Sequence, residues 1–438
     1  MQNLTLSYQP TSDITVNPRN ARTHDKRQLQ QIKESIEAFG FTNPLLVDER
    51  GVLIAGHGRL SAARSLNIEA VPVIELAHLS EPQKRALMLA DNKIALNAGW
   101  DMDVLANELS ELSSIELDFG LELTGFDVAD IDIIIGDAEA CEDAQAEVAP
   151  VPANDMPVVT KPGDLWLLGK HRVLCGNARR AADFAMLMGD RKADMVFTDP
   201  PYNVPIVGHV TGKGRARHRE FHEASGEMSQ TEFTDFLGDV FANCVASCRD
   251  GAISYVCMDW RHAGELLEAG QQVFDAYLNL CIWAKTNGGM GSLYRSQHEL
   301  VFVFRKGKEQ HRNNVQLGRF GRNRTNVWTY AGVNTFREGR MEELSAHPTA
   351  KPVAMIKDAI LDVTKRGEVV LDPFLGGGAT LMAAEQSGRA AYAMDIDPAY
   401  IDVALRRWEK DTGQDPRRAI DNRTFTSLEA EQHGEAMT

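Results

Sequence analysis

The sequence predicts an α/β protein whose larger, second part is built on an open and largely parallel sheet. After about residue 160, apolar segments of strand length alternate with helical stretches, which is the pattern of such sheets. The two most distinctive loops of the chain each follow one of these strands directly, where ligands of open α/β sheets bind. A stretch rich in acidic residues, proline and alanine, 137–160, predicts a linker to a smaller first part.

The first part, residues 1–136, is predicted to be a small α/β domain. Apolar residues recur at helical spacing over Lys26–Phe39 and Gly40 follows, so a helix is expected there. A second helix is expected to begin near Arg59. Short apolar runs predict strands at Pro44–Val47, Val52–Ala55 and Ala70–Leu76.

The second part, residues 161–412, carries the alternation that defines the predicted sheet. Its expected strands are Met195–Thr198, Ala252–Met258, Tyr277–Trp283, Leu300–Phe304, Val369–Leu371 and Ala391–Met394. Its expected helices include Ala263–Ala269, Ala354–Thr364 and Tyr400–Trp408. The last residues, 413–438, are polar and aperiodic, which predicts a flexible tail.

The net charge of −16 is unevenly distributed along the 438 residues. Residues 1–160 contain 11 basic and 26 acidic residues, whereas residues 161–438 contain 35 basic and 36 acidic residues. The acidity of the first part therefore does not exclude a basic, DNA-binding groove in the second.

Composition also limits the compartment and the cofactor chemistry. No run of about 18 apolar residues occurs, and the start of the chain lacks a secretory pattern, so we expect a cytoplasmic protein without a membrane span. The six cysteines are scattered, and only Cys244 and Cys248 lie close together. Because no second pair completes a zinc set, we expect buried free thiols and no metal site.

The first distinctive loop, Thr198–Asn203, reads TDPPYN and follows a strand directly. Two consecutive prolines fix φ and remove both backbone donors, so the loop presents acceptors. Asp199 and the carbonyl of Pro200 can accept both hydrogens of an exocyclic amino group, and Tyr202 offers a face on which an extracted base can stack. The alternative is an ordinary strand exit. We predict that the residues acting in catalysis are Asp199, Pro200, Pro201 and Tyr202.

The second loop, Asp372–Thr380, reads DPFLGGGAT and also follows a strand. Glycines at the entry to a helix let the backbone approach a ligand closely. Asp395, at the end of the next strand, can accept both ribose hydroxyls of a nucleoside. A glycine-rich turn alone is shared with dinucleotide binders and plain tight turns. The predicted cofactor-binding residues here are Asp372, Phe374, Gly376, Gly378, Thr380 and Asp395.

Together these segments resemble the DNA amino-methyltransferases (adenine-N6 or cytosine-N4) in the β arrangement, where the DPPY motif precedes the cofactor motif. The resemblance extends over roughly Gly163 to Asp411. It implies a Rossmann-like methyltransferase sheet, S-adenosylmethionine as cofactor, no required metal, and site-specific transfer of a methyl group to a base flipped out of double-stranded DNA, as in restriction-modification. Asp rather than Ser before the prolines favours adenine N6, and cytosine N4 is the alternative.

The resemblance also implies roles for residues outside the two loops. Thr349 and Lys351, in the segment HPTAKP, are expected to help close the cofactor pocket, although Lys351 could equally be a surface charge beside a helix start. Asn177 stands where relatives usually carry aspartate, and its amide oxygen could accept a hydrogen bond from the adenine of the cofactor.

Two basic stretches of the second part are candidates for DNA contact, with a solvated charged surface as the alternative. The first, residues 208–222, is rich in glycine, and the second is residues 305–324. The candidate DNA-binding residues are Lys213, Arg215, Arg217, Arg219, Arg319, Arg322 and Arg324.

In the first part, Gly56, His57, Gly58 and Arg59 follow a strand and open a helix, which suits phosphate binding. Over about residues 10–135 the chain resembles the ParB/sulfiredoxin-like domain, which implies nucleotide or DNA-related binding. The alternative is a purely structural strand–turn–helix. Reductase activity is not expected, because the turn lacks a cysteine.

Two further alternatives concern the whole chain. It could be a nucleotide-switched ParB-like DNA-binding protein with an inactive second part, or a methyltransferase acting on RNA or on a protein amide. A homodimer is compatible with the sequence.

Overall fold

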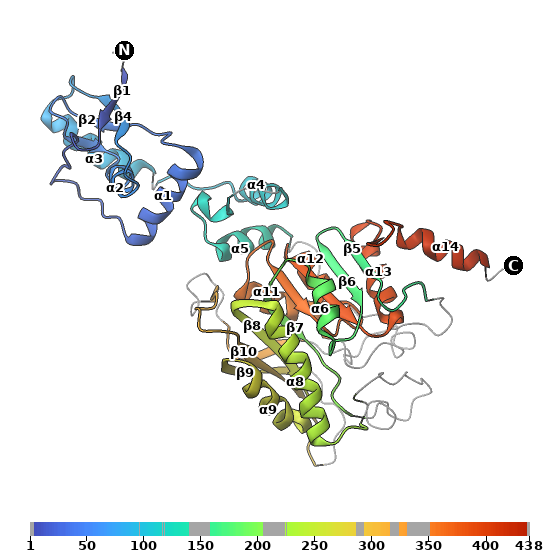
Figure 1. Ribbon diagram of the computed structural model, residues 1–438. Coiled ribbons are helices and arrows are strands. Elements are labelled where there is room, and N and C mark those ends of the chain that lie inside the picture. The colour runs from blue at the N-terminus through green and yellow to red at the C-terminus, as the bar shows by residue number, and fades with distance from the viewer. Residues whose placement is uncertain are drawn as a thin grey trace. The chain divides into compact units, whose positions relative to one another are not determined.

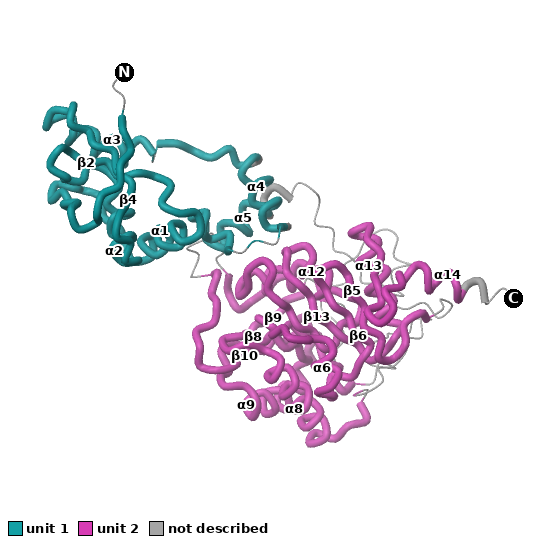
Figure 2. The backbone as a smooth tube through the Cα atoms, turned by 45° about the horizontal axis from the view of Figure 1, so that its top comes forward, with its two compact units in different colours: residues 1–141 teal, residues 142–438 magenta. Residues whose placement is uncertain are grey.

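A four-stranded sheet and a ten-stranded sheet organise the chain into two units, residues 1–141 and 142–438 (Figures 1 and 2). The computed structural model describes residues 4–95, 97–115, 117, 119–139, 158–204, 224, 226–285, 293–315, 324–330 and 351–435. Within these ranges, no helix combines the length and apolar character needed to cross a bilayer.

The sheet of the first unit has the order β1-β4-β2-β3. Its strands are β1 (Leu6–Pro10), β2 (Leu45–Val47), β3 (Leu53–Ala55) and β4 (Ala70–Glu75). Strand β2 runs parallel to β4, and the other pairs are antiparallel. The helices that accompany it are α1 (Lys26–Phe39), α2 (His57–Ser65) and α3 (Glu81–Ala95). Val47 and Val73 from the strands pack with Leu60 of α2 in one apolar core.

A second, smaller core follows in the same unit. It joins α4 (Met102–Ser114) and α5 (Val128–Glu139), with the short helix η1 (Leu121–Thr124) between them. Leu105 and Leu109 of α4 pack against Ile131 and Ile135 of α5, apart from the core of the four-stranded sheet. The prediction of one small α/β domain missed this helical subdomain.

The ten-stranded sheet of the second unit has the order β11-β9-β10-β8-β7-β12-β13-β6-β5-β14. Its strands are β5 (Leu165–Leu168), β6 (His171–Cys175), β7 (Ala193–Thr198), β8 (Cys248–Met258), β9 (Ala276–Lys285), β10 (His298–Arg305), β11 (Val327–Tyr330), β12 (Val369–Asp372), β13 (Ala390–Asp395) and β14 (Arg417–Arg418). The central strands β8, β7, β12, β13 and β6 are parallel to one another, whereas β10, β5 and β14 are antiparallel to their neighbours. The predicted largely parallel sheet is therefore mixed at its edges.

Helices cover both faces of this sheet (Figure 1). On one face lie α6 (Ala181–Met188), α8 (Gln230–Ser247) and α9 (Ala263–Val273), and on the other lie α11 (Val353–Val363), α12 (Ala379–Gln386), α13 (Pro398–Thr412) and α14 (Phe425–Glu435). Side chains alternate between the two cores along each central strand. In β12, Val370 faces α11 and α12, whereas Leu371 faces α6 and α8. This alternation explains why the strands read as continuous apolar runs.

The prediction of a flexible tail over residues 413–438 is wrong for most of that segment. Arg417 and Arg418 pair with β5, and α14 follows. Phe425 is completely buried, with its ring 5.5 Å from that of Trp166. One buried aromatic side chain anchors this stretch, which has no apolar periodicity and therefore carries no local pattern that predicts an ordered element.

A buried hydrogen-bond network ties the start of β6 to α12 and α13. The backbone N–H of Ala391 donates to His171 Nδ1 (2.8 Å), so the proton of this neutral imidazole sits on Nε2, which donates to Glu385 (2.8 Å). Trp408 Nε1 donates to the same carboxylate oxygen (2.8 Å). Burial alone would raise the pKa of Glu385, but His171, Trp408 and the nearby Lys170 lower it to about 2.

Glu385→Gln is expected to lower the free energy of unfolding at pH 7 by about 1–3 kcal/mol, because the shared ionised acceptor is lost. The folded-state pKa lies below the ordinary value of 4.5, so the advantage of the wild type is present above about pH 4.5 and is lost as the pH falls towards 2. Urea denaturation of both proteins from pH 7 to pH 3 measures this. A difference that does not change over that range would contradict the assignment.

Candidate active site

The two loops predicted from the sequence lie side by side at one edge of the large sheet. Strand β7 is parallel to β12, with Met195 opposite Val370 and Val196 opposite Leu371. Both strands end where their loops begin, and β13 ends at Asp395 beside them. Tyr202 and Phe374, one from each loop, pack against the same apolar core. The fold therefore brings the TDPPYN and DPFLGGGAT segments together.

Asn203 fixes the first loop against the start of α8. Its φ of +52° is in the left-handed region, which Asn tolerates better than most residues. Its side-chain oxygen accepts hydrogen bonds from the backbone of Gly226 (3.0 Å) and Met228 (3.2 Å), and its amide donates to the carbonyl of Met228 (2.8 Å). The sequence interpretation gave this residue no role, although it closes the motif.

Asp199 lies in a hydrogen-bonded group with Tyr202 and Lys351. The Tyr202 hydroxyl donates to Asp199 Oδ1 (2.6 Å), and the Lys351 ammonium donates to Asp199 Oδ2 (2.6 Å) and to the Tyr202 oxygen (3.0 Å). The side chain of Lys351 is only 3% exposed, whereas that of Asp199 is 26% exposed. The ammonium is thus buried against the carboxylate, and Lys351 is not a surface charge.

Glu299 and Lys285 complete this group. Glu299 belongs to a segment that carries the family resemblance, but the sequence analysis gave neither residue a role. Lys285 is the last residue of β9, and Glu299 is the second residue of the antiparallel strand β10. Lys285 donates to Glu299 Oε1, and the Lys351 ammonium lies 2.9 Å from Glu299 Oε2. The sequence feature that could have pointed to them is a charged residue at the last position of one apolar strand and another at the second position of the next strand. We call these five residues the charge cluster: Asp199, Tyr202, Lys285, Glu299 and Lys351.

The two carboxylates of the charge cluster differ in acidity. Burial raises the pKa of Asp199, which Lys351 opposes and Glu299 reinforces. Burial would also raise the pKa of Glu299, but Lys351 and Lys285 together lower it to about 2. Burial raises the pKa of Tyr202, so its hydroxyl stays protonated and can donate. Glu299 is therefore a permanent anion, and Asp199 is the carboxylate that can take up a proton.

The glycine-rich loop turns sharply into α12 and leaves open space at Gly376. Gly378 precedes α12 at a φ of +83°, and Gly376 has a φ of +52° with open space where a side chain would stand. The Gly376 N–H donates to Asp395 Oδ2 (2.9 Å). Asp372 and Thr380 are buried behind the loop, and Phe374 is half-buried. These residues fit a ligand that lies against the turn, with the Asp395 carboxylate at its rim.

Asn177 reaches this loop region but already has a local partner. Its side-chain oxygen accepts from the backbone of Arg179 (2.8 Å), and its own N–H donates to Asp183 (2.7 Å). The neighbouring Gly176 N–H donates to the carbonyl of Asp395 (2.9 Å), which places this turn beside the end of β13. Thr349 lies outside the described residues.

Arg324 does not suit the predicted DNA contact. Its guanidinium is paired with Asp358 (2.7 Å) and Asp362 (2.7 Å) of α11 and lies over the ring of Trp328. Its side chain is 17% exposed. It joins β11 to α11 instead. The other candidates lie outside the described residues, namely Lys213, Arg215, Arg217, Arg219, Arg319 and Arg322.

In the first unit, the predicted phosphate-binding turn opens α2. Gly56 precedes the helix at a φ of +101°, and an added side chain would collide with Leu45. Arg59 donates to the carbonyl of Asn43 (3.1 Å), so its guanidinium braces the turn. Gly58 is buried in α2.

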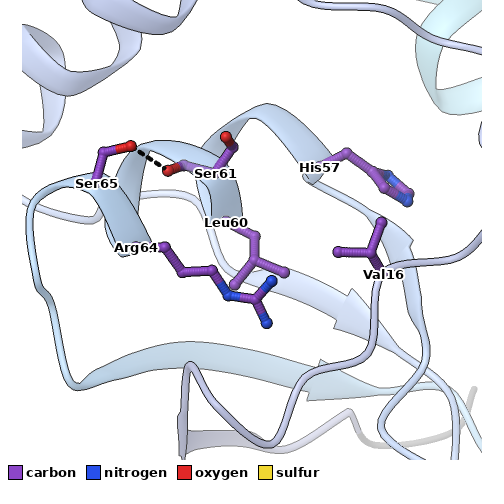
Figure 3. Close-up of a pocket in the computed structure, with 6 residues that line it drawn as sticks. All are labelled: Val16, His57, Leu60, Ser61, Arg64 and Ser65. Carbon is purple, nitrogen blue, oxygen red and sulfur yellow. Dashed lines mark hydrogen bonds between the residues drawn. The ribbon is translucent and has the colours of Figure 1, made fainter.

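A pocket of about 440 Å³ lies on the same helix (Figure 3). Figure 3 shows its lining residues, which are Val16, His57, Leu60, Ser61, Arg64 and Ser65. Arg64 donates to the carbonyls of Thr11 (2.8 Å) and Ile14 (2.7 Å). His57 Nε2 is buried and has no hydrogen-bond partner among the described residues.

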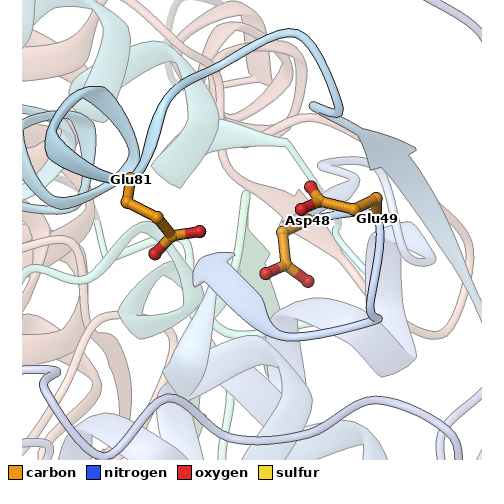
Figure 4. Close-up of side chains that lie close together, drawn as sticks. All are labelled: Asp48, Glu49 and Glu81. Carbon is orange, nitrogen blue, oxygen red and sulfur yellow. The ribbon is translucent and has the colours of Figure 1, made fainter.

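Three carboxylates of the first unit, Asp48, Glu49 and Glu81, lie close enough to hold a metal ion (Figure 4). The Lys84 ammonium lies 2.7 Å from Glu49 and 3.2 Å from Glu81, and Arg50 lies 3.1 Å from Asp48. Two cations of the chain, Arg50 and Lys84, therefore already pair with these three carboxylates.

Three segments of the chain match known families. Residues 193–406 match the DNA methylase family, residues 2–93 match the ParB N-terminal domain, and residues 103–162 match the ParB-methyltransferase HTH domain.

Three relatives extend this likeness. The ParB-like nuclease domain-containing protein YnaK of Escherichia coli K12 is 46% identical over 84 residues, which cover 19% of this chain and 97% of that protein. The type II methyltransferase M.HpaI of Haemophilus parainfluenzae is 24% identical over 254 residues, covering 55% and 74%. The DNA adenine methyltransferase YhdJ of E. coli K12 is 25% identical over 239 residues, covering 49% and 75%.

The second unit is therefore a methyltransferase that acts on DNA, with S-adenosylmethionine as its cofactor. The chain carries a C-terminal N6/N4 DNA methylase domain together with a ParB N-terminal domain and a ParB-methyltransferase HTH domain. The helical subdomain of α4 and α5 lies in the HTH region.

This HTH region is strongly acidic. Between Lys93 and Lys161 the sequence contains 16 aspartate and glutamate residues and no lysine or arginine. Lysine and arginine supply most of the affinity of proteins for DNA phosphates. The region therefore lacks the side chains on which non-specific DNA binding depends.

Asp372→Asn is expected to change the pH dependence of stability. Burial raises the pKa of Asp372 to about 7, so the folded wild type retains a proton that the unfolded chain releases near pH 4. The wild type thus loses stability as the pH rises towards 7, and asparagine does not. From pH 5 to pH 8, the free energy of unfolding of the variant should gain about 1–3 kcal/mol relative to the wild type. A constant difference in urea denaturation would contradict this.

Proposed function

We propose that this protein methylates the N6 amino group of adenine at specific sites in double-stranded DNA. The observation that carries the proposal is the placement of Asp199, a partly exposed carboxylate, at the strand edge that also carries the glycine-rich loop. An aspartate before the two prolines favours adenine, as does the likeness to a protein named DNA adenine methyltransferase. The target base must be flipped out of the duplex to reach this edge.

The residues of the first loop orient and deprotonate the target amine. Asp199 and the carbonyl of Pro200 accept its two hydrogens, which directs the nitrogen lone pair away from the ring. The ring of Tyr202 stacks on the base and offsets part of the cost of flipping, which is about a few kcal/mol. After transfer the nitrogen carries an extra proton, and Asp199, whose pKa is raised by burial, is placed to take it.

The residues of the second loop hold the cofactor. When bound, S-adenosylmethionine supplies a methyl group on a positively charged sulfur that is a good leaving group. The backbone at Gly376 and Gly378 allows close approach, and Asp395 accepts hydrogen bonds from the ribose. Phe374 and Asn177 are assigned to the adenine ring of the cofactor. Thr380 and Asp372 support the turn of the loop.

The chief alternative is cytosine N4, since both amines present two hydrogens to the same acceptors. A nucleotide in the pocket of the first unit is a separate proposal. It is favoured by the position of His57 at the start of α2 with an unsatisfied buried nitrogen. Calorimetric titration with nucleoside triphosphates tests it, and the absence of heat at millimolar concentration would exclude it.

Asp199→Asn is expected to reduce methyl incorporation into DNA about 100-fold or more, because one acceptor of the amine hydrogens becomes a poor one and the base is lost. Labelled methyl transfer measures the rate, and mass analysis of nucleosides from the product identifies the base. Asp239→Asn, at an exposed position of α8, is the matched control and should retain wild-type activity.

Three outcomes would contradict parts of the proposal. Finding N4-methylcytosine in the product would show that the target is cytosine N4 and not adenine N6. Equal background counts from wild type and Asp199→Asn would favour a ParB-like DNA-binding protein with an inactive second unit. Faster methylation of RNA or protein than of DNA would exclude DNA as the main substrate.

A further inference from the structure

The Lys351 ammonium holds the acceptor that the target amine needs. Its Nζ lies 2.6 Å from Asp199 Oδ2, 3.0 Å from the Tyr202 oxygen and 2.9 Å from Glu299 Oε2. An ammonium has three donors, and a charge-assisted hydrogen bond of this length is strong. A base amine that approaches Asp199 must therefore compete with Lys351 for the same carboxylate.

Glu299 provides the alternative position for this ammonium. Its Oε2 lies 2.9 Å from the Lys351 ammonium and 3.1 Å from the Tyr202 hydroxyl oxygen, and its other oxygen is held by Lys285. Glu299 is 9% exposed and lies on β10, which pairs with β8 on one side and with β9 on the other. It therefore stays in place when the first loop adjusts to a base. Lys351 can release Asp199 without losing a carboxylate partner.

We propose that Glu299, held by Lys285, is a positioning residue that retains the Lys351 ammonium while Asp199 exchanges it for the amino group of the target base. This inference rests on the proposed function of Asp199. The charge cluster contains two carboxylates and two ammonium groups, so it remains balanced before and after the exchange. Without the negative charge of Glu299, Asp199 would be the carboxylate of the cluster left to hold Lys351.

The pKa of Asp199 responds to its two charged neighbours in opposite directions. Glu299 raises the pKa of Asp199, and Lys351 lowers it. The titratable groups that surround Asp199 come from six segments: Tyr202 after β7, Cys257 of β8, Lys285 of β9, Glu299 of β10, Lys351 before α11 and Asp372 of β12. Burial raises the pKa of Cys257, so this thiol contributes no charge.

The test is the pH dependence of single-turnover methylation of DNA by the full chain, with saturating S-adenosylmethionine. Activity should fall at acid pH as Asp199 becomes protonated. In Glu299→Gln, the rate should drop roughly 10- to 100-fold, because Asp199 stays paired with Lys351. The acid limb of its pH–rate profile, where the rate falls as Asp199 is protonated, should move to lower pH by about one unit. The reason is that the negative charge of Glu299 beside Asp199 has been removed. In Lys351→Met, the acid limb should move to higher pH.

Glu385→Gln is the matched control, since it removes a carboxylate whose partners are His171 and Trp408 and not the charge cluster, and it should leave the acid limb unchanged. A structural role of Glu299 in packing alone would lower activity without opposite shifts in the two variants, and that result would overturn the inference. A wild-type rate and limb in Glu299→Gln would also overturn it, although the proposed function would stand.

Two further measurements keep the outcomes distinct. A wild type that transfers no methyl group to DNA refutes the proposed function itself. If Glu299→Gln fails to fold, as judged by thermal unfolding, Lys285→Met tests the same carboxylate, because Glu299 then loses its anchor and retains its charge. Its rate should fall severalfold, and an unchanged rate in a folded protein would overturn the inference.

Discussion

The parallel pairing of β7 with β12 is the constraint on which the site depends. Carboxyl ends of adjacent parallel strands meet at one edge of a sheet, so the loops that follow them share one location although 173 residues separate Asp199 from Asp372. The two faces of both strands are buried under helices, which leaves this edge as the place where polar groups can gather. The order of the strands thus brings an amine acceptor next to a nucleoside-binding turn.

The charge cluster shows why the protein tolerates buried ions at that edge. Removing one partner of a buried ion pair typically costs about 3–5 kcal/mol, because the other charge is left uncompensated. Here each carboxylate contacts an ammonium, and Glu299 contacts two. These ion pairs need not make a net contribution to the stability of the folded protein. It keeps Glu299 ionised, and it leaves the pKa of Asp199 raised by burial so that this carboxylate can accept a proton.

The negative charge of the chain is concentrated between its ParB-like and methylase domains. The methylase unit has nearly equal numbers of basic and acidic residues, whereas the stretch between Lys93 and Lys161 has only acidic ones. The match to the HTH domain therefore does not by itself indicate that this subdomain contacts DNA, because its acidic side chains repel phosphates.

By itself, the sequence determined the class of fold, the central strands and the two loops, because apolar periodicity and turn composition are local properties. It also determined the helix Lys26–Phe39 to the residue. Tertiary structure alone decided which charged side chains meet. Glu299 and Lys285 join Asp199 only through the antiparallel pairing of β9 with β10, and Lys351 arrives from a segment 152 residues after Asp199. Arg324 appeared to belong to a basic DNA-binding stretch, but its partners lie on α11, 34 and 38 residues further on. The physical reason is that ion pairs between distant segments depend on strand order and register, which no short stretch of sequence encodes.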